Sequence, residues 1–158
     1  MKKKLTYIII TVSICLLIGF LSGFVATQTS ANDWYIGLNK PSFNPPNWIF
    51  APVWTILYIM TGIAVGIIWA KGFYHLLVKT ALYHFGFQLL LNASWGIVFY
   101  GFKAPFWSLL IILILVVLII LTIQWFKLIS KTAAYLLIPY LVWVCFVTIL
   151  NYNIWILN

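Results

Sequence analysis

Residues 104–126, with the sequence APFWSLLIILILVVLIILTIQWF, contain no charged side chain. An α-helix needs about 20 apolar residues to cross the hydrocarbon core of a bilayer, which is about 30 Å thick. This stretch is long enough, and Lys103 and Lys127 bound it on either side. We therefore predict a transmembrane helix over residues 104–126.

The composition of the whole chain agrees with a membrane protein. Of 158 residues, nine are Lys or Arg, one is Asp or Glu, and 65% are hydrophobic. About a quarter of the residues of a soluble domain are charged, so a soluble enzyme, a nucleic-acid-binding domain and a disordered tail are excluded. The formal net charge of +8 does not indicate a nucleic-acid partner, because the lysines lie in short gaps between apolar runs and form no stripe.

Four further uncharged runs are long enough to span a membrane: residues 7–26, 48–70, 80–102 and 132–157. The strands of a membrane β-barrel would be about 10 residues long with alternating polarity, and no such pattern occurs. We expect an all-α integral membrane protein, a five-transmembrane-helix bundle that forms a single domain over residues 1–158. The one long connection, residues 28–47, is expected to be a lid-like loop.

The distribution of lysines predicts the orientation of the chain in a cell membrane. Positive residues are more frequent in cytoplasmic connections. With the N-terminus inside, seven lysines lie inside, whereas only Lys40 and Lys103 lie outside. This distribution predicts a multi-pass protein with its N-terminus inside, its C-terminus outside and the 28–47 loop outside.

The first apolar run has an alternative interpretation as a secretory signal. Lysines precede it, and the small residues Thr29-Ser30-Ala31 that follow resemble a cleavage site. The run is longer than the apolar part of most signal peptides, and Gly19-x-x-x-Gly23 is typical of close helix packing in membranes. A retained helix is therefore favoured. Cys15 and Cys145 fall in the middle of spans, where we expect small apolar fillers.

Residues 34–62, WYIGLNKPSFNPPNWIFAPVWTILYIMTG, combine prolines and aromatic residues. The prolines stiffen the loop, which fits a lid over the bundle, and also fits a loop that only packs on the bundle through interfacial Trp anchors. Asn44-Pro45 suits the start of a helix. Pro52 predicts a kink that opens space beside Trp54 and Tyr58, which lie one turn apart.

Polar and aromatic residues form one stripe on the third span: His84, Gln88, Asn92, Trp95 and Phe99. Such a stripe should face the bundle interior, because polar groups are costly in lipid. It indicates either a ligand site or hydrogen bonds between helices. His84 is expected to have a structural or interfacial role. Pro139 predicts a kink in the last span. Residues 109–123 are almost purely aliphatic and are expected at the periphery.

Conventional catalytic constellations are missing from the sequence. The chain has one acid, Asp33, and two histidines, His75 and His84. It therefore offers no carboxylate pair, no Cys/His cluster for a metal, and no Ser/His/Asp set. A proton- or sodium-coupled transporter usually needs an ionisable residue in the membrane, and His84 is the only candidate.

In these polar and aromatic segments the chain resembles the TspO/MBR family, the translocator proteins also called peripheral-type benzodiazepine receptors. The resemblance rests on five ordered motifs: WYxxLxKPxFxPPxW at 34–48, PVWTxLYxMxG at 52–62, QLxLNxxW at 88–95, PYxxW at 139–143 and LNYxxW at 150–155. It covers residues 34–158 and implies five helices, a homodimer, and no required cofactor or metal.

The resemblance also implies a ligand pocket under the first loop. Family members bind porphyrins such as protoporphyrin IX, and isoquinoline carboxamide or benzodiazepine-type ligands. Carried over by position, the pocket residues are Tyr35, Pro45, Ile49, Trp54, Tyr58, Gln88, Asn92, Trp95, Trp143, Phe146, Val147 and Leu150. Cholesterol, a ligand of the animal proteins, is not expected, because no basic residue follows Tyr152. Val147, often Ala in the family, is expected to narrow the pocket.

Three functions follow from this resemblance, in decreasing order of preference. The first is a membrane receptor or sensor that binds porphyrin, whose carboxylates either Lys40 or the N-terminus of the second helix would attract. The second is light-dependent porphyrin degradation, in which Trp34 and Trp143 relay an electron or trap a reactive species. The third is passive transport of porphyrin or lipid. An accessory membrane subunit without a ligand would explain the spans but not the gathered aromatic and amide residues.

Overall fold

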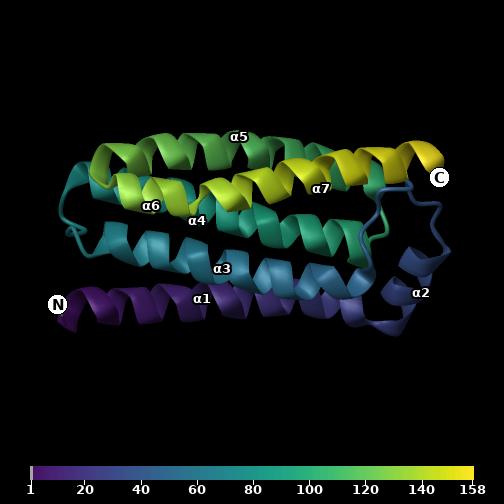
Figure 1. Cartoon of the computed structure of the whole chain (residues 1–158), viewed down its shortest axis with the longest axis horizontal. Helices are drawn as coiled ribbons and strands as arrows, with labels where there is room; N and C mark the ends of the chain where they lie inside the picture. Colours follow the sequence, from purple (N-terminus) through teal and green to yellow (C-terminus); the bar gives the residue numbers. More distant parts are fainter. Residues whose placement is uncertain (1) are drawn as a thin grey trace.

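A computed structural model describes residues 2–158, with the side chains of Lys2 and of residues 29–31 left aside. The described chain is helical and contains no strand. Its long helices lie side by side in one elongated bundle, with the N-terminus and the C-terminus at opposite ends (Figure 1). The elements are α1 (Lys2–Thr27), α2 (Thr29–Gly37), α3 (Asn47–Trp69), α4 (Leu76–Gly96), the π-helical segment η1 (Ile97–Gly101), α5 (Pro105–Ile129), α6 (Lys131–Leu136) and α7 (Ile138–Leu157).

Four stretches of the described chain are long and apolar enough to span a membrane: Lys3–Thr27, Asn47–Trp69, Pro105–Ile129 and Lys131–Leu157. The chain is therefore a multi-pass, all-helical membrane protein. The expected span at residues 80–102 corresponds to α4 and η1, which do not meet the same criterion. Lys79, Gln88 and Asn92 lower the mean hydropathy of this helix, so composition supports four spans and not five.

The connection at residues 28–47 differs from the expected loop. Its first part forms the helix α2, and only residues after Gly37 are irregular. The predicted helix start at Asn44-Pro45 is wrong, because α3 begins at Asn47 with Pro46 as its N-cap. Asn44 instead accepts a 3.3 Å hydrogen bond from the Tyr35 hydroxyl, so its side chain ties the loop to α2.

The predicted kink at Pro139 is confirmed as a break between α6 and α7. Pro139 lies in the first turn of α7. The N–H groups of a first turn have no partner within the helix, so the missing N–H of proline costs no helical hydrogen bond there. The backbone N–H of Leu137, at the break, donates to the carbonyl of Ala134 at 3.1 Å. Pro52, in contrast, lies inside the continuous helix α3.

Glycines bring α1 and α3 into close contact. A Cβ atom at Gly62 would lie 2.5 Å from the Cα of Val12, and one at Gly66 would lie 2.5 Å from the Cα of Ile8. The Thr11 hydroxyl donates a 2.7 Å hydrogen bond to the carbonyl of Gly62 across the same contact. Small residues that let backbones approach are a recurring basis of helix association in membranes. Helix α1 is thus a wall of the bundle.

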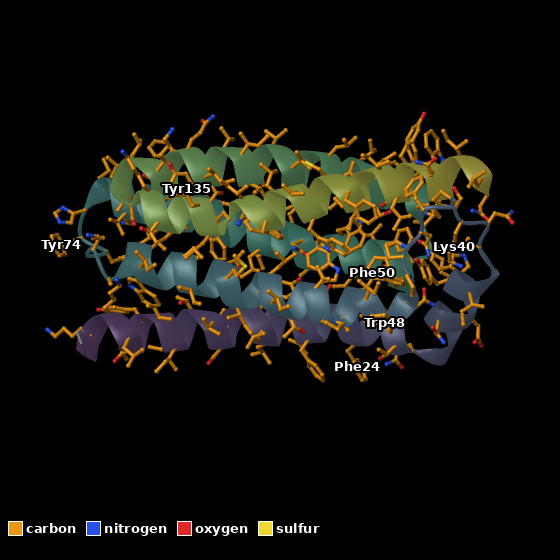
Figure 2. All side chains as sticks on the ribbon, in the orientation of Figure 1. Phe24, Lys40, Trp48, Phe50, Tyr74 and Tyr135 are labelled. Carbon is orange, nitrogen blue, oxygen red and sulfur yellow. The ribbon has the colours of Figure 1, made fainter. Side chains whose placement is uncertain are left out.

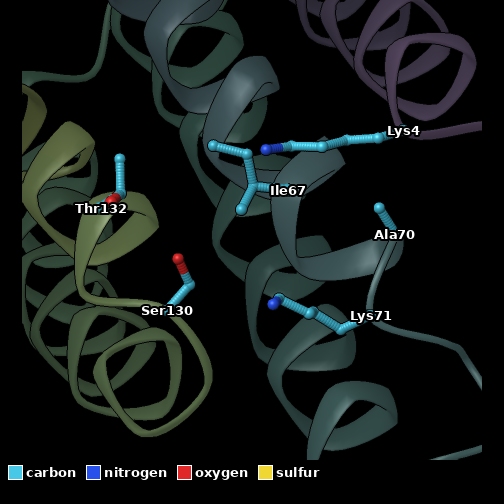
Figure 3. A pocket seen from close by; sticks show the side chains of 6 residues that line it. All are labelled: Lys4, Ile67, Ala70, Lys71, Ser130 and Thr132. Atoms are coloured by element: carbon cyan, nitrogen blue, oxygen red, sulfur yellow. The ribbon is translucent and has the colours of Figure 1, made fainter. Parts of the chain in front are cut away.

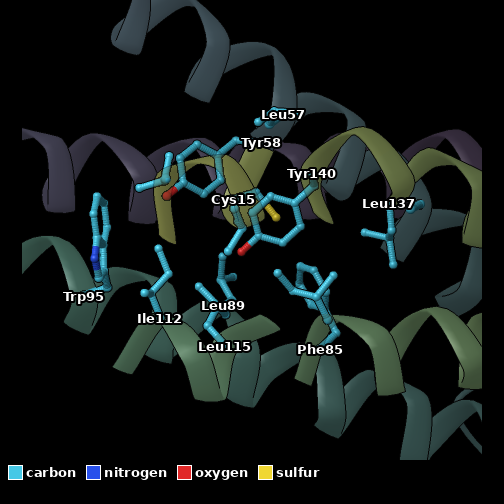
Figure 4. Close-up of a cluster of buried hydrophobic side chains, with 14 of the residues drawn as sticks. Cys15, Leu57, Tyr58, Phe85, Leu89, Trp95, Ile112, Leu115, Leu137 and Tyr140 are labelled. Carbon is cyan, nitrogen blue, oxygen red and sulfur yellow. The ribbon is translucent and has the colours of Figure 1, made fainter. Parts of the chain in front are cut away.

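The buried core lies between α3, α4, α5 and α7 and contains Tyr58, Leu89, Trp95, Leu115 and Tyr140 (Figure 4). The expectation that residues 109–123 lie at the periphery is only partly met, because this part of α5 also contributes fully buried residues such as Ile112. Its opposite side, with Leu113 and Val117, is exposed, as expected for contact with lipid. Large side chains such as Trp48, Tyr74 and Tyr135 are also exposed on the outside of the bundle (Figure 2). These exposed faces have the apolar character that a bilayer requires.

Candidate functional site

A cavity lies between α1, α3 and α4, with α2 at its end. Its volume is about 820 Å³, within the usual range for small-molecule sites. Eight aromatic side chains line it: Phe20, Phe24, Tyr35, Phe50, Trp54, Tyr58, Trp95 and Tyr100. The cavity therefore offers a large aromatic surface to an apolar molecule.

Two indoles form the centre of this aromatic wall. The rings of Trp54 and Trp95 have their centroids 6.1 Å apart and are tilted by 35°. Tyr58, one turn after Trp54 on α3, stacks on it at 5.7 Å. Trp95 continues the stack towards Phe99 at 5.7 Å. The helical spacing of four residues brings Trp54 and Tyr58 to one face, as the sequence predicts.

Asn92 is the polar centre of the wall. Its amide oxygen accepts a 3.1 Å hydrogen bond from the Tyr58 hydroxyl, and its amide nitrogen donates to the Tyr140 hydroxyl at 2.6 Å. An amide has two N–H groups and two acceptor sites on its oxygen. One donor and one acceptor site of Asn92 therefore have no partner within the described chain.

The Trp95 indole is held by a second polar group. Its Nε1–H donates to the Asn151 side-chain oxygen at 3.0 Å. That oxygen also accepts from the Ser108 hydroxyl at 2.9 Å, and the Asn151 amide donates to the carbonyl of Pro105 at 2.8 Å. Because its N–H is occupied, Trp95 presents only its ring to the cavity.

Five of the twelve pocket residues carried over by resemblance line the cavity: Tyr35, Trp54, Tyr58, Asn92 and Trp95. The other seven do not line it: Pro45, Ile49, Gln88, Trp143, Phe146, Val147 and Leu150. Val147 and Leu150 are buried in the core of α7, so the extra methyl groups of Val147 do not narrow this cavity. Trp143 contacts Trp54 edge-on, with centroids 6.4 Å apart.

Helix α1 forms one side of the cavity, but none of the twelve residues carried over by resemblance belongs to α1. Leu16, Gly19, Phe20, Gly23 and Phe24 line the cavity from α1. Among them, Gly19 lies so close to the Tyr58 ring that a Cβ atom would collide with it, whereas a Cβ at Gly23 would meet nothing within 4 Å. The Gly19-x-x-x-Gly23 pattern was a signal for close packing, but it did not indicate which helix is contacted.

Tyr100 and Phe50 are two further lining residues that sequence reasoning missed. Phe50 lies one turn before Trp54, so the same helical spacing could have identified it. Tyr100 lies in the π-helical segment η1, whose wider turn changes which residues face inward. Hydrophobic periodicity carries no signal for such a local change.

The residues around Tyr35 close the end of the cavity nearest α2. The ammonium group of Lys40 lies 4.6 Å from the centroid of the Tyr35 ring and donates to the carbonyls of Ile36 at 3.2 Å and Leu38 at 3.4 Å. Partial burial lowers the pKa of Lys40, and burial raises the pKa of Tyr35 against the opposing effect of its bond to Asn44. Lys40 orders the loop and does not line the cavity.

The irregular loop is also attached to the last residue of the chain. The backbone N–H of Asn39 donates to the Asn158 side-chain oxygen at 3.0 Å, and the Asn158 amide donates back to the carbonyl of Asn39 at 3.0 Å. The Asn39 side chain adds a 3.3 Å bond to the carbonyl of Leu157. We call these three bonds the Asn39–Asn158 clasp.

Two side chains beside the site have buried polar atoms without a partner. Both polar atoms of Gln88 and the indole nitrogen of the partly buried Trp143 have no hydrogen-bond partner among the described residues. An unsatisfied buried polar group costs about 1–3 kcal/mol. His84, the remaining polar member of the α4 stripe, lies at the α5 side with its ring 5.7 Å from that of Trp125.

Comparisons with known proteins agree with this architecture. The sequence profile of the TspO/MBR family matches residues 11–156. The chain is 40% identical to the tryptophan-rich protein TspO of Chlorobaculum tepidum, over 100% of this chain and 99% of that protein. It is 38% identical to the human translocator protein, over 77% of this chain and 73% of that protein. It is 32% identical to the tryptophan-rich sensory protein of Cereibacter sphaeroides, over 80% of this chain and 78% of that protein.

Proposed function

The chain belongs to the TspO/MBR family, and we propose that it is a membrane receptor or sensor that binds a flat, mostly apolar ligand. Porphyrins such as protoporphyrin IX are the first candidates, and isoquinoline carboxamide or benzodiazepine-type molecules are the second. The observation that carries this proposal is the 820 Å³ cavity with its aromatic wall and the Asn92 amide. The name of the Cereibacter sphaeroides relative, a sensory protein, supports the sensing role.

Ligand binding would follow from the geometry of the cavity. Trp54 and Trp95 offer ring faces, and aromatic contacts contribute about 1 kcal/mol each beyond the burial of area. The unused donor and acceptor sites of Asn92 would orient a polar edge of the ligand. The lining residues include no charged side chain, so most of the affinity would come from apolar burial.

A cavity-filling pair of variants tests the location of the ligand. Gly23 lines the cavity, and Gly86 on α4 does not; a Cβ atom at either position meets nothing within 4 Å. Protoporphyrin IX is titrated in the dark into detergent-solubilised protein and followed by Trp fluorescence. We expect saturable quenching that Gly23→Leu weakens at least tenfold and Gly86→Leu leaves unchanged. Equal quenching in both variants would place the ligand elsewhere.

Light-dependent porphyrin degradation is the second candidate function. The ring of Trp143 contacts that of the cavity-lining Trp54, with centroids 6.4 Å apart. The ring of Trp34 contacts that of Phe99, with centroids 5.5 Å apart. Phe99 in turn stacks on Trp95. Both tryptophans would thus lie one or two rings behind a bound porphyrin. Irradiated complexes of Trp34→Phe and Trp143→Phe test this role, and unchanged product formation in both would contradict it.

We also propose that α4 and η1 form a fifth crossing, with the N-terminus of the chain inside. The opposite positions of the two termini support an odd number of crossings (Figure 1), and the polar side chains Gln88 and Asn92 are buried within the bundle and not exposed to lipid. A reporter that is fluorescent only in the cytoplasm tests the orientation. It should be fluorescent when fused to the N-terminus and dark when fused to the C-terminus.

A further inference from the structure

A second cavity lies at the opposite end of the bundle from α2. Its volume is about 260 Å³, and it is lined by Lys4, Ile67, Ala70, Lys71, Ser130 and Thr132. These residues come from α1, from the end of α3 and the two residues that follow it, and from the N-cap and start of α6. The amino groups of Lys4 and Lys71 point towards the side of the cavity where the Ser130 and Thr132 hydroxyls lie (Figure 3).

This cavity has two positive charges and no acidic partner. The only acidic side chain of the protein, Asp33, belongs to α2 at the far end of the bundle. The Ser130 oxygen accepts a 3.4 Å bond from the backbone N–H of Ala133, which leaves its O–H free to donate. The Thr132 hydroxyl has no hydrogen-bond partner within the described chain. Two cations and two hydroxyl donors are the groups that bind the oxygen atoms of a phosphate.

The position of the cavity matches the headgroup region of a bilayer. It lies where the apolar spans of α1 and α3 meet Lys4 and Lys71. The rings of Tyr7 and Trp69 contact each other at 5.0 Å beside it, and Tyr and Trp are enriched at the membrane–water interface. Ile67 and Ala70 give the cavity an apolar side, next to which the glycerol and acyl part of a lipid would lie.

We propose that this cavity binds the phosphate group of an anionic phospholipid. Lys4 and Lys71 neutralise the charge of the headgroup, while Ser130 and Thr132 donate hydrogen bonds to its oxygen atoms. A bound lipid would connect α1, α3 and α6 at this end of the bundle. The site is distinct from the aromatic cavity and does not depend on the ligand proposed there.

Lipid binding to the purified full chain in detergent tests the proposal. Native mass spectrometry is used to titrate the protein with phosphatidylglycerol, phosphatidylcholine and inorganic phosphate. A lysine near a membrane surface contributes about fivefold to anionic-lipid affinity. We therefore expect Lys4→Gln/Lys71→Gln to lower phosphatidylglycerol affinity about 25-fold. Lys127→Gln, which removes an exposed lysine in the last turn of α5, outside the cavity, should leave the affinity unchanged.

Three outcomes would overturn the proposal. Equal losses in the double variant and in Lys127→Gln would mean a diffuse attraction between charges. Equal affinities for phosphatidylglycerol and phosphatidylcholine would mean that the headgroup charge is not recognised. Saturable binding of inorganic phosphate without any lipid preference would assign the cavity to a free anion. If the double variant does not fold, Lys71→Gln alone should still show the fivefold loss.

Discussion

The indole nitrogen of Trp95 donates a 3.0 Å hydrogen bond to the side-chain oxygen of Asn151 and thereby joins α4 to α7. The bond lies in the buried interior, where Trp95 is 7% exposed. Asn151 is 2% exposed and also binds Ser108 and the carbonyl of Pro105. One amide therefore holds three elements together and sets the orientation of a ring in the cavity wall.

Replacing Asn151 should lower both stability and ligand affinity. Asn151→Leu removes three hydrogen bonds and leaves the Trp95 N–H without a buried partner. Hydrogen bonds within membrane bundles average about 0.6 kcal/mol each, so we expect a loss of about 2 kcal/mol, seen in thermal unfolding in detergent. The control Asn153→Leu removes a side chain that bonds only within its own helix, to Ile149. A stability loss as large in the control would contradict the bridging role of Asn151.

The glycine contact between α1 and α3 gives a second prediction. Gly62→Ala places a methyl group against the backbone of Val12, which cannot move aside as a side chain would. Overpacking of this kind costs about 1–3 kcal/mol, measured as a lower midpoint of thermal unfolding. Gly86→Ala enters open space and should be neutral or slightly stabilising, because Ala is the better helix former. An unchanged midpoint for Gly62→Ala would show that α1 is not closely packed.

Much of the fold follows from the sequence, because uncharged runs bounded by lysines predict α1, α3, α5 and α7. Helix α2 was missed because it is short and polar and precedes a proline-rich loop, features typical of irregular structure. The composition of α4 does not identify it as a span, because Gln88 and Asn92 make the helix less apolar, and the fifth crossing is therefore a proposal.

The candidate site was predictable only in part. Helical spacing relates Trp54 to Tyr58 and Asn92 to Trp95. It does not reveal that α1 faces them, because Leu16 and Phe20 resemble any lipid-facing residues. It also does not show that Val147 packs into the core instead of lining the cavity. The partner of a helix face depends on how the helices pack together, which a single sequence does not encode locally.

The Asn39–Asn158 clasp should control access to the end of the cavity beneath the loop. Asn158→Ala removes two of its three bonds, each worth about 1 kcal/mol. We expect faster amide hydrogen exchange in residues 38–46 and faster association of protoporphyrin IX, with little change in the midpoint of thermal unfolding. Asn153→Ala, on the same helix but outside the clasp, should change neither rate. Unaltered exchange in Asn158→Ala would mean that other contacts hold the loop.

Lys40 should act through the order of the loop and not through the charge of the ligand. Its ammonium group is engaged with the Tyr35 ring and two carbonyls, and it does not line the cavity. Lys40→Met should therefore weaken protoporphyrin IX and a neutral isoquinoline carboxamide to a similar extent, a few-fold each, in equilibrium titrations. A loss confined to the porphyrin would instead assign Lys40 to its carboxylates.

Gln88 and Asn92 lie one turn apart on α4, and substitution with Leu should affect them in opposite ways. Both side chains are buried, but only Asn92 is hydrogen-bonded. Gln88→Leu removes two unsatisfied polar atoms at similar volume and should raise stability by about 1–2 kcal/mol, without changing ligand affinity. Asn92→Leu leaves the Tyr58 and Tyr140 hydroxyls without their hydrogen-bond partner and should lower both the stability and the ligand affinity. Thermal unfolding and porphyrin titration of the two variants measure the contrast. A stability loss in Gln88→Leu would show that a buried water or ligand group satisfies this amide, and Gln88 would then join Asn92 among the residues that recognise polar groups.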